Sequence, residues 1–172
     1  MQNITKMVVI NLHIREKSMV IVGNGCAGAE CIKALRESGY NEKIHLLTDS
    51  RWPISNPMLT PYYVAGKIGF DGLFPYGASQ EFYLKYGVDV YAESPVVALD
   101  AVQKMVYAKT GLKLKYDKCL IATGATPILP PIEGIDSDRV YTLRTVEDAT
   151  RLKRAMAKKP KKTLVIGASM VG

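Results

Sequence analysis

Met19-Val-Ile-Val-Gly-Asn-Gly-Cys-Ala-Gly28 joins a short apolar run to three closely spaced glycines. Its apolar first half, Met19–Val22, predicts a buried strand, and the run from Ala29 to Arg36 has the spacing of an amphipathic helix. A second apolar run, Ile44–Leu47, predicts a strand parallel to the first. Residues 19–49 therefore predict one βαβ unit, with a glycine turn between its first strand and its helix.

Each glycine of this turn has a physical role in holding a dinucleotide. Gly23 permits the tight turn out of the strand, Gly25 lets the backbone approach a pyrophosphate, and Gly28 lets the helix pack closely against the strand. The helix that begins near Cys26 and Ala27 directs unpaired N–H groups and the positive end of its dipole at the phosphates. The turn therefore predicts an anion site that needs no basic side chain.

An acidic residue completes the pattern. Asp49 follows the second predicted strand, 21 residues after Gly28, where a carboxylate can accept hydrogen bonds from both ribose hydroxyls. The alternative for these residues is an ordinary glycine turn with a surface aspartate. The pattern alone does not distinguish a site for FAD from a site for NAD.

The composition excludes several classes of protein. The chain has 172 residues, 48% hydrophobic and 23% charged, which is typical of a globular protein and not of a disordered, collagen-like or disulfide-rich chain. It shows neither a membrane span nor a signal-peptide pattern, so we expect a cytoplasmic protein. Its three cysteines form no C-x-x-C pair, and its two distant histidines predict no metal cluster.

The net charge of +7 is confined to one segment. Residues 1–150 hold 16 Lys and Arg against 16 Asp and Glu, so the excess lies after residue 150. Seven cations surround Pro160 there: Arg151, Lys153, Arg154, Lys158, Lys159, Lys161 and Lys162. Because no aromatic residues are interleaved with them, this pattern indicates the solvated end of a helix rather than a phosphate-binding patch, and we expect no nucleic-acid partner.

The remainder of the chain predicts an α/β fold with a parallel sheet and an antiparallel meander. Residues 51–77 form a connection rich in Pro, Gly and Tyr that we expect to be ordered, and Ser79–Tyr86 predicts a helix stopped by Gly87. Cys119–Ala122 predicts a further buried strand. Three short runs separated by turn residues predict the meander: Val96–Leu99, Lys104–Ala108 and Leu112–Tyr116.

The opening pattern recurs near the C-terminus. A helix predicted over Val146–Ala157 leads into a predicted strand, Thr163–Ile166, and then a second glycine turn that reaches Gly172. We therefore expect an N-terminal extension over residues 1–17, in which Val8–Ile14 alternates as an edge strand would. A nucleotide-binding domain follows over residues 18–145. Residues 146–172 then form a connecting helix and the opening of a second such domain, which predicts a piece of a longer protein.

One further stretch resembles a known family. Tyr116-Asp-Lys-Cys-Leu-Ile-Ala-Thr-Gly-Ala-Thr-Pro-Ile-Leu-Pro130, together with both glycine turns, resembles the N-terminal FAD-binding domain of the pyridine nucleotide-disulfide oxidoreductase superfamily. That superfamily includes ferredoxin reductases, NADH oxidases, coenzyme A disulfide reductases, nitrite reductase flavin domains and apoptosis-inducing factor. The resemblance implies that the first turn binds the FAD pyrophosphate, that Ala122, Thr123 and Gly124 pass along FAD, and that the second turn binds NAD(P)H.

The same resemblance implies further contacts with FAD. It places Arg51 and Pro53 along the adenosine half, the backbone of Val96 at the adenine edge, and Arg144 on the flavin side. For Arg51 and Arg144 the alternative is a solvated surface cation, and for Val96 it is an ordinary position in the core of a strand.

The cysteines depart from the thiol-dependent members of the superfamily. Cys26 and Cys31 lie five positions apart on the first helix, so their thiols point about 140° apart, and we interpret both as packing residues. Where single-cysteine members place their thiol this chain has Met58, and where ferredoxin reductases often carry a lysine it has Thr60-Pro61-Tyr62. This pattern favours electron transfer through the flavin alone.

The resemblance therefore implies the FAD-binding part of an NAD(P)H-dependent flavoprotein oxidoreductase without a redox-active cysteine. An iron–sulfur or other electron-carrier protein is the expected partner, and the full-length protein is expected to be a homo-oligomer. The fragment is expected to be inactive alone. The alternatives are a thiol-dependent NADH oxidase or disulfide reductase, and a non-catalytic flavin-binding module.

Overall fold

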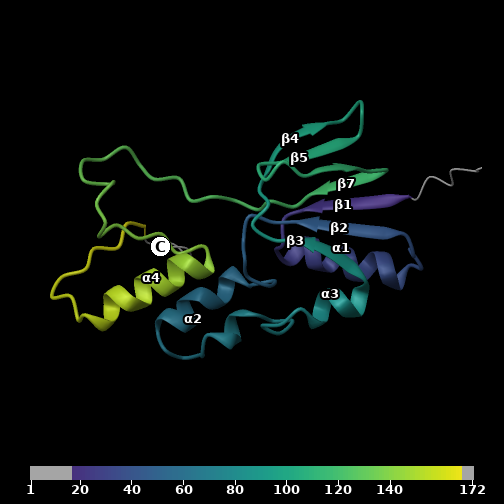
Figure 1. The fold of residues 1–172 in the computed structure, drawn as a ribbon. Helices are drawn as coiled ribbons and strands as arrows, with labels where there is room; N and C mark the ends of the chain where they lie inside the picture. Colours follow the sequence, from purple (N-terminus) through teal and green to yellow (C-terminus); the bar gives the residue numbers. More distant parts are fainter. Residues whose placement is uncertain (1–16, 168–172) are drawn as a thin grey trace, which may run out of the picture.

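A four-stranded parallel sheet organises residues 17–167, the part of the chain that the computed structural model describes (Figure 1). Its strand order is β3-β2-β1-β7, and every neighbouring pair runs parallel. The four strands are β1 (Ser18–Val22), β2 (Lys43–Leu47), β3 (Val88–Tyr91) and β7 (Lys118–Ile121). Helix α1 (Cys26–Glu37) connects β1 to β2, which confirms the predicted βαβ unit.

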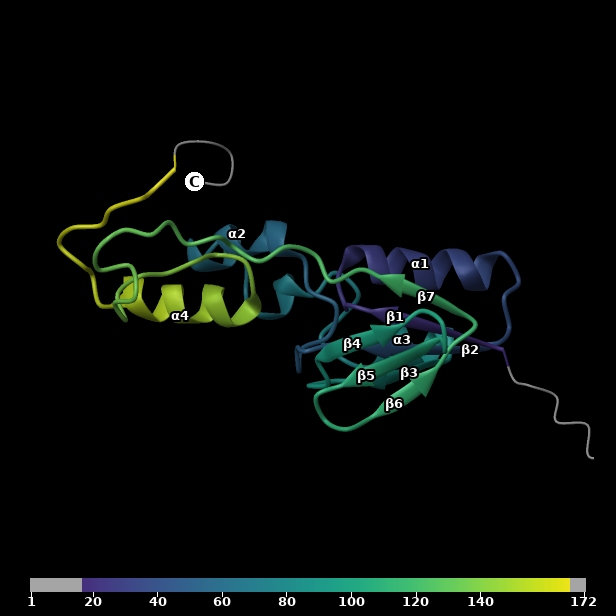
Figure 2. The same cartoon turned by 90° about the horizontal axis from the view of Figure 1, so that it is seen from above.

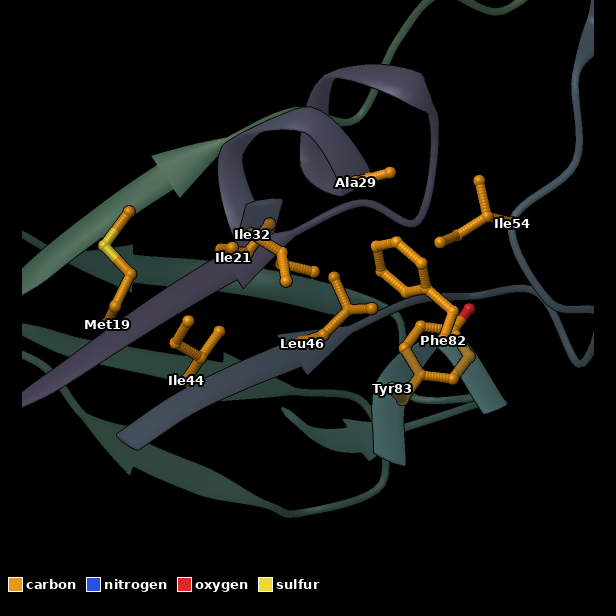
Figure 3. Close-up of a cluster of buried hydrophobic side chains, with 9 residues drawn as sticks. All are labelled: Met19, Ile21, Ala29, Ile32, Ile44, Leu46, Ile54, Phe82 and Tyr83. Carbon is orange, nitrogen blue, oxygen red and sulfur yellow. The ribbon is translucent and has the colours of Figure 1, made fainter. Parts of the chain in front are cut away.

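The central strand β1 is buried on both faces, so its side chains alternate between two cores. On one face it packs against α1 and against helix α3 (Glu81–Tyr86), in the cluster drawn in Figure 3. On the other face Val20 and Val22 pack with Val106 and Tyr116. The sheet is therefore the middle of three layers.

The third layer is a second, antiparallel sheet. Its order is β4-β5-β6, with strands β4 (Val96–Asp100), β5 (Met105–Ala108) and β6 (Lys113–Lys115). Figure 2 shows these strands on the opposite side of the parallel sheet from α1. The expected fold class, a Rossmann-like domain with a parallel sheet and a three-stranded antiparallel meander, is confirmed.

The long connection between β2 and α3 is ordered, as predicted. It holds two 3-10 turns, η1 (Pro57–Leu59) and η2 (Asp71–Leu73), and the short helix α2 (Thr60–Val64). Its aromatic residues form a cluster of their own, in which Phe70 meets both Trp52 and Phe74 edge to face. Helix α2 in turn packs against a second helix, beyond the carboxyl ends of the parallel strands (Figure 1).

That second helix is α4 (Val146–Ala157), whose bounds the sequence analysis predicts correctly. A capping box begins it, because the Asp148 amide donates to Thr145 Oγ1 at 3.1 Å and the Thr145 amide donates to Asp148 Oδ2 at 3.1 Å. Val146 and Ala149 are buried, whereas the other side of the helix is exposed. Within residues 17–167 no helix is both long enough and apolar enough to span a bilayer.

The structure differs from the sequence-based expectation at two strands of the parallel sheet. β3 was not predicted, because four residues that include Asp89 are too few to show a clear period. β7 was predicted as a buried strand, but it lies at the edge of the described sheet, and the side chain of Ile121 is 66% exposed. An edge strand has one neighbour, so one of its sides stays open.

The C-terminal repeat is only partly described. Thr163–Ile166 was predicted as a strand, but it is exposed coil without strand pairing, because an isolated strand has no neighbour for its backbone hydrogen bonds. Gly167 nevertheless has a φ of +112°, close to the +114° of Gly23. The rest of the second turn and the predicted edge strand Val8–Ile14 lie outside the described residues.

The guanidinium of Arg36 joins α1 to the end of α3. It donates to the carbonyls of Tyr86 at 2.8 Å and Gly87 at 3.0 Å, and to those of Tyr40 at 2.6 Å and Glu42 at 2.9 Å. Arg36→Ala leaves four carbonyl groups without this donor, so we expect it to lower the free energy of unfolding by about 2 to 3 kcal/mol. Urea denaturation followed by circular dichroism measures the change.

Lys33 provides the matched control for Arg36. It lies on the same helix and pairs with Glu30 at 3.0 Å on the surface. We expect Lys33→Ala to leave the midpoint of unfolding nearly unchanged, because surface ion pairs contribute little. Equal midpoints for the Arg36→Ala and Lys33→Ala variants would show that the Arg36 hydrogen bonds do not hold α1 to α3.

Candidate functional site

The glycine turn lies where three neighbouring strands end. The Gly23 amide donates to the Leu47 carbonyl at 2.9 Å, and the Ala122 amide donates to the Val22 carbonyl at 2.7 Å. Gly23 has a φ of +114°, and a Cβ built on it would lie 2.2 Å from the Ala122 carbonyl oxygen. Only glycine fits this position, for both backbone and steric reasons. Two of the predicted site segments are therefore in direct contact.

The other two glycines differ in their surroundings. A Cβ on Gly28 would lie 2.4 Å from the Gly23 carbonyl oxygen, so a side chain there would push the helix away from the turn. A Cβ on Gly25 would meet nothing within 4 Å. Gly25 precedes α1 with φ −99° and ψ −172°, an extended conformation that other residues also adopt. The structure around this turn therefore does not by itself require glycine at position 25.

The start of α1 is free to receive an anion. Cys26 and Ala27 are exposed, and no side chain caps the helix at Gly25. The first turn of α1, all of it described, contains no acidic residue that would offset the positive end of the helix dipole. Its first N–H groups lack partners within the helix, as at every helix start. This combination suits a diphosphate lying across the open space at Gly25.

Asn24 fixes the turn in place, a role that the sequence analysis missed. Its Nδ2 donates to the Trp52 carbonyl at 3.1 Å, and its Oδ1 accepts from the Tyr83 hydroxyl at 2.9 Å. Burial raises the pKa of the Tyr83 phenol, so the hydroxyl remains a donor over a wider pH range. The two partners are far away in the sequence, so no local pattern could have revealed this bridge.

The predicted adenosine side lies around the end of β2. Asp49 is exposed just after the buried Thr48, whose carbonyl accepts from the Ser94 amide at 2.8 Å. This bond holds the start of the meander near Asp49, and the half-buried Val96 follows two residues later at the first position of β4. Pro53 is half-buried in the connection that leaves this end of the sheet.

Two more predicted site residues, Gly124 and Arg144, meet on the side where the resemblance implies the flavin. Gly124 has a φ of +72°, and an Arg144 guanidinium nitrogen lies 3.2 Å from where a Cβ on Gly124 would be. Thr123 sits between Gly124 and Ala122, so Arg144 lies beside the segment that contacts Gly23. The amide of Arg144 donates to Asp148 Oδ2 at 3.0 Å, which ties it to the start of α4.

Arg51 contacts a different part of the structure. Its guanidinium carbon lies 4.8 Å from the centre of the Trp52 ring, and the Trp52 indole N–H donates to Glu147 on α4. The structure thus joins the glycine turn with Ala122–Gly124 and Arg144, and places Arg51 near α4.

Three cysteines lie within the described residues, and two of them, Cys31 and Cys119, are partly buried. All three cysteines are free thiols; burial raises the pKa of Cys31 and of Cys119, which disfavours their reactive thiolate forms. The interpretation of Cys26 as a packing residue is wrong, because it is exposed at the start of α1. Residues 17–167 contain no group of three or more His, Cys, Asp or Glu side chains that could hold a metal ion.

Met58 and Thr60 lie in the connection between β2 and α3, at the positions compared above with the thiol and lysine of other superfamily members. Met58 is 72% exposed, so its thioether is available to an incoming group. Thr60 is buried and its hydroxyl donates to the Pro57 carbonyl at 2.7 Å, which holds the start of α2.

Comparison with curated proteins gives relatives over most of the chain. It is 35% identical over 162 residues to "Apoptosis-inducing factor 3" of Homo sapiens, which covers 90% of this chain and 25% of that protein. It is 34% identical over 160 residues to "NADH-dependent phenylglyoxylate dehydrogenase subunit epsilon" of Aromatoleum evansii, covering 92% and 37%. The chain thus spans about a quarter to two fifths of the length of these relatives.

Solved structures agree with the fold. A NAD-dependent persulfide reductase from A. fulgidus matches with a TM-score of 0.83 and 30% identity, over 90% of this chain and 30% of that one. The putidaredoxin reductase–putidaredoxin complex matches with a TM-score of 0.74 and 29% identity, over 81% of this chain and 34% of that one.

A family profile covers nearly the whole chain. The profile described as pyridine nucleotide-disulphide oxidoreductase matches residues 17–172, and proteins of this family bind FAD and NAD(P)H as oxidoreductases. With the glycine turn, the meander and these relatives in agreement, the chain belongs to the pyridine nucleotide-disulphide oxidoreductase family.

Proposed function

We propose that residues 18–145 are the FAD-binding part of an NAD(P)H-dependent flavoprotein oxidoreductase. The observation that carries this proposal is the asymmetry of the turn: Gly23 and Gly28 have backbone atoms against them, whereas the space at Gly25 is open. Nothing within the described protein uses that space. A pyrophosphate that approaches the backbone there would explain the glycine at position 25, because a side chain would occupy the same space.

The site residues fall into three groups, which would contact the pyrophosphate, the adenosine half and the flavin half of FAD. The N–H groups from Cys26 to Gly28 would hold the pyrophosphate, and Asp49 would accept the ribose hydroxyls of the adenosine half. Arg51, Pro53 and the backbone of Val96 would lie along the adenosine. On the other side, Ala122–Gly124 and Arg144 would lie along the flavin, where the guanidinium beside Gly124 supplies a fixed positive charge.

FAD, when bound, accepts a hydride and releases electrons singly or in pairs. The chain's own residues orient it and contribute no redox group. We propose that the second glycine turn, which opens within residues 146–172, belongs to an NAD(P)H-binding domain. The relatives named for ferredoxin and for NADH support a nicotinamide donor or acceptor and an electron-carrier protein as partner. Assembly as a homo-oligomer is part of the same proposal.

The cysteines give a prediction that separates this mechanism from a thiol-dependent one. We expect Cys26→Ser, Cys31→Ala and Cys119→Ala to leave the rate of flavin reduction by NAD(P)H within about twofold of the unchanged protein, since a thiolate is the reactive form and none is needed. Stopped-flow absorbance of the full-length protein is the measurement. A charge-transfer band that disappears with one cysteine would establish a thiol mechanism instead.

Cofactor identity tests the proposed function itself. The turn and Asp49 are expected to recognise pyrophosphate and adenosine, which FMN lacks, so the chain should bind FAD at least about tenfold more tightly than FMN. Equilibrium dialysis of the purified 172-residue chain with each flavin measures both affinities. Equal affinities for the two flavins, or NADH binding without flavin binding, would overturn the proposal.

A further inference from the structure

A cleft of about 620 Å³ lies between α4 and the connection over residues 51–70. Arg51 lines it from the connection, and Arg151, Arg154 and Lys158 line it from α4. The glycine turn, Ala122–Gly124 and Arg144 do not line it. Apart from Arg51, the cleft therefore uses none of the residues assigned to FAD.

The cations from α4 share one face of the helix. Glu147, Arg151, Arg154 and Lys158 recur at spacings of three and four residues, which places them in one stripe along the cleft. The buried Val146 lies about 100° around the helix from Glu147 and packs with Leu73 and Phe74. Four cationic residues and one acidic residue, Glu147, therefore line the cleft. The cleft carries an excess of positive charge.

Two of these guanidinium groups lie over aromatic rings, one from the adjacent residue and one from the loop before α4. Arg51 lies over Trp52 at 4.8 Å from the ring centre, and Arg151 lies over Tyr141 at 4.7 Å. Arg151 also donates to the Asp138 carbonyl at 2.6 Å. The sequence suggested a solvated helix end because no aromatic residues are interleaved with the cations of residues 151–162, but the fold brings Tyr141 beside Arg151.

We propose that this cleft binds the phosphate groups of a small phosphorylated molecule, at a site that shares only Arg51 with the residues assigned to FAD. Ordered guanidinium groups recognise phosphate oxygens through paired N–H donors, and less side-chain freedom is lost when they are already held. The cleft has the size of an ordinary small-molecule site. The Glu147 carboxylate, which also lines the cleft, accepts a hydrogen bond from the Trp52 indole N–H.

Calorimetric titration of the FAD-saturated 172-residue chain tests the proposal, with pyrophosphate and ATP as separate probes. We expect saturable binding of one anion per chain, weakened by added salt. In the double variant Arg151→Gln/Arg154→Gln the affinity should fall at least about tenfold. The control Lys161→Gln/Lys162→Gln removes the same charge from exposed residues outside the cleft and should change affinity less than about twofold.

The probes and variants distinguish the alternatives. Similar affinities for the two probes would assign recognition to phosphate alone, and tighter ATP binding would add a contact with the nucleoside; both support the site. The proposal is overturned if neither anion binds saturably, if both double variants lose affinity equally, or if a short DNA duplex binds more tightly than either probe. Titration of the FAD-free chain gives one further control. An anion that binds the FAD-free chain but is displaced by FAD occupies the glycine turn, and this result would also overturn the proposal. If the double variant unfolds, Arg154→Gln alone carries the same test.

Discussion

Gly23→Ala is expected to destabilise the domain by about 3 to 5 kcal/mol, the range of severe single substitutions. The added Cβ would lie 2.2 Å from the Ala122 carbonyl oxygen, and the backbone has a φ of +114°, which alanine adopts only with strain. Either β7 must separate from the turn or the turn must change conformation, so the contact that joins the two site segments is lost. Urea unfolding followed by circular dichroism measures the effect.

Gly69→Ala is the matched control for that substitution. A Cβ on Gly69 would meet nothing within 4 Å, and its φ lies outside the left-handed region. We expect its free energy of unfolding to stay within about 0.5 kcal/mol of the unchanged chain. A Gly23→Ala variant as stable as Gly69→Ala would show that the turn does not pack against β7 as described.

The second large effect concerns binding rather than stability. Gly25→Val should weaken FAD binding at least about 100-fold, because its side chain would occupy the space proposed for the pyrophosphate. The fold should tolerate it, since Gly25 has an extended backbone and a Cβ there meets nothing within 4 Å. Fluorescence titration with FAD, alongside urea unfolding of the same sample, gives both quantities. Unchanged FAD affinity in a folded Gly25→Val variant would place the pyrophosphate elsewhere.

Local patterns were sufficient to predict the elements near the site. The apolar run of β1 and the glycine spacing predicted the βαβ unit, and the helical pattern over 146–157 predicted α4. Gly87, with a φ of +56°, ends α3 where the sequence indicated. These elements were predictable because each has its cause in neighbouring residues.

The features that were missed depend on residues far apart in the chain. Asn24 bridges Trp52 and Tyr83, and Trp52 reaches Glu147 on α4. Likewise, Tyr141 comes beside Arg151 only through the packing of the loop before α4. β3 was missed for a different reason, since so short a strand is defined by its pairing with β2 rather than by its own sequence. Such contacts appear only once the sheet and the helices are in place.

Backbone amide NMR locates bound FAD along the chain. In a ¹⁵N-labelled sample of the chain titrated with FAD, we expect the largest amide shifts from Gly25 to Gly28, with a second group at Thr123 and Gly124. These amides surround the open space at the start of α1 and the segment beside Arg144. Saturating shifts confined to other parts of the chain, with the amides of Gly25 to Gly28 unchanged, would contradict the proposed FAD site.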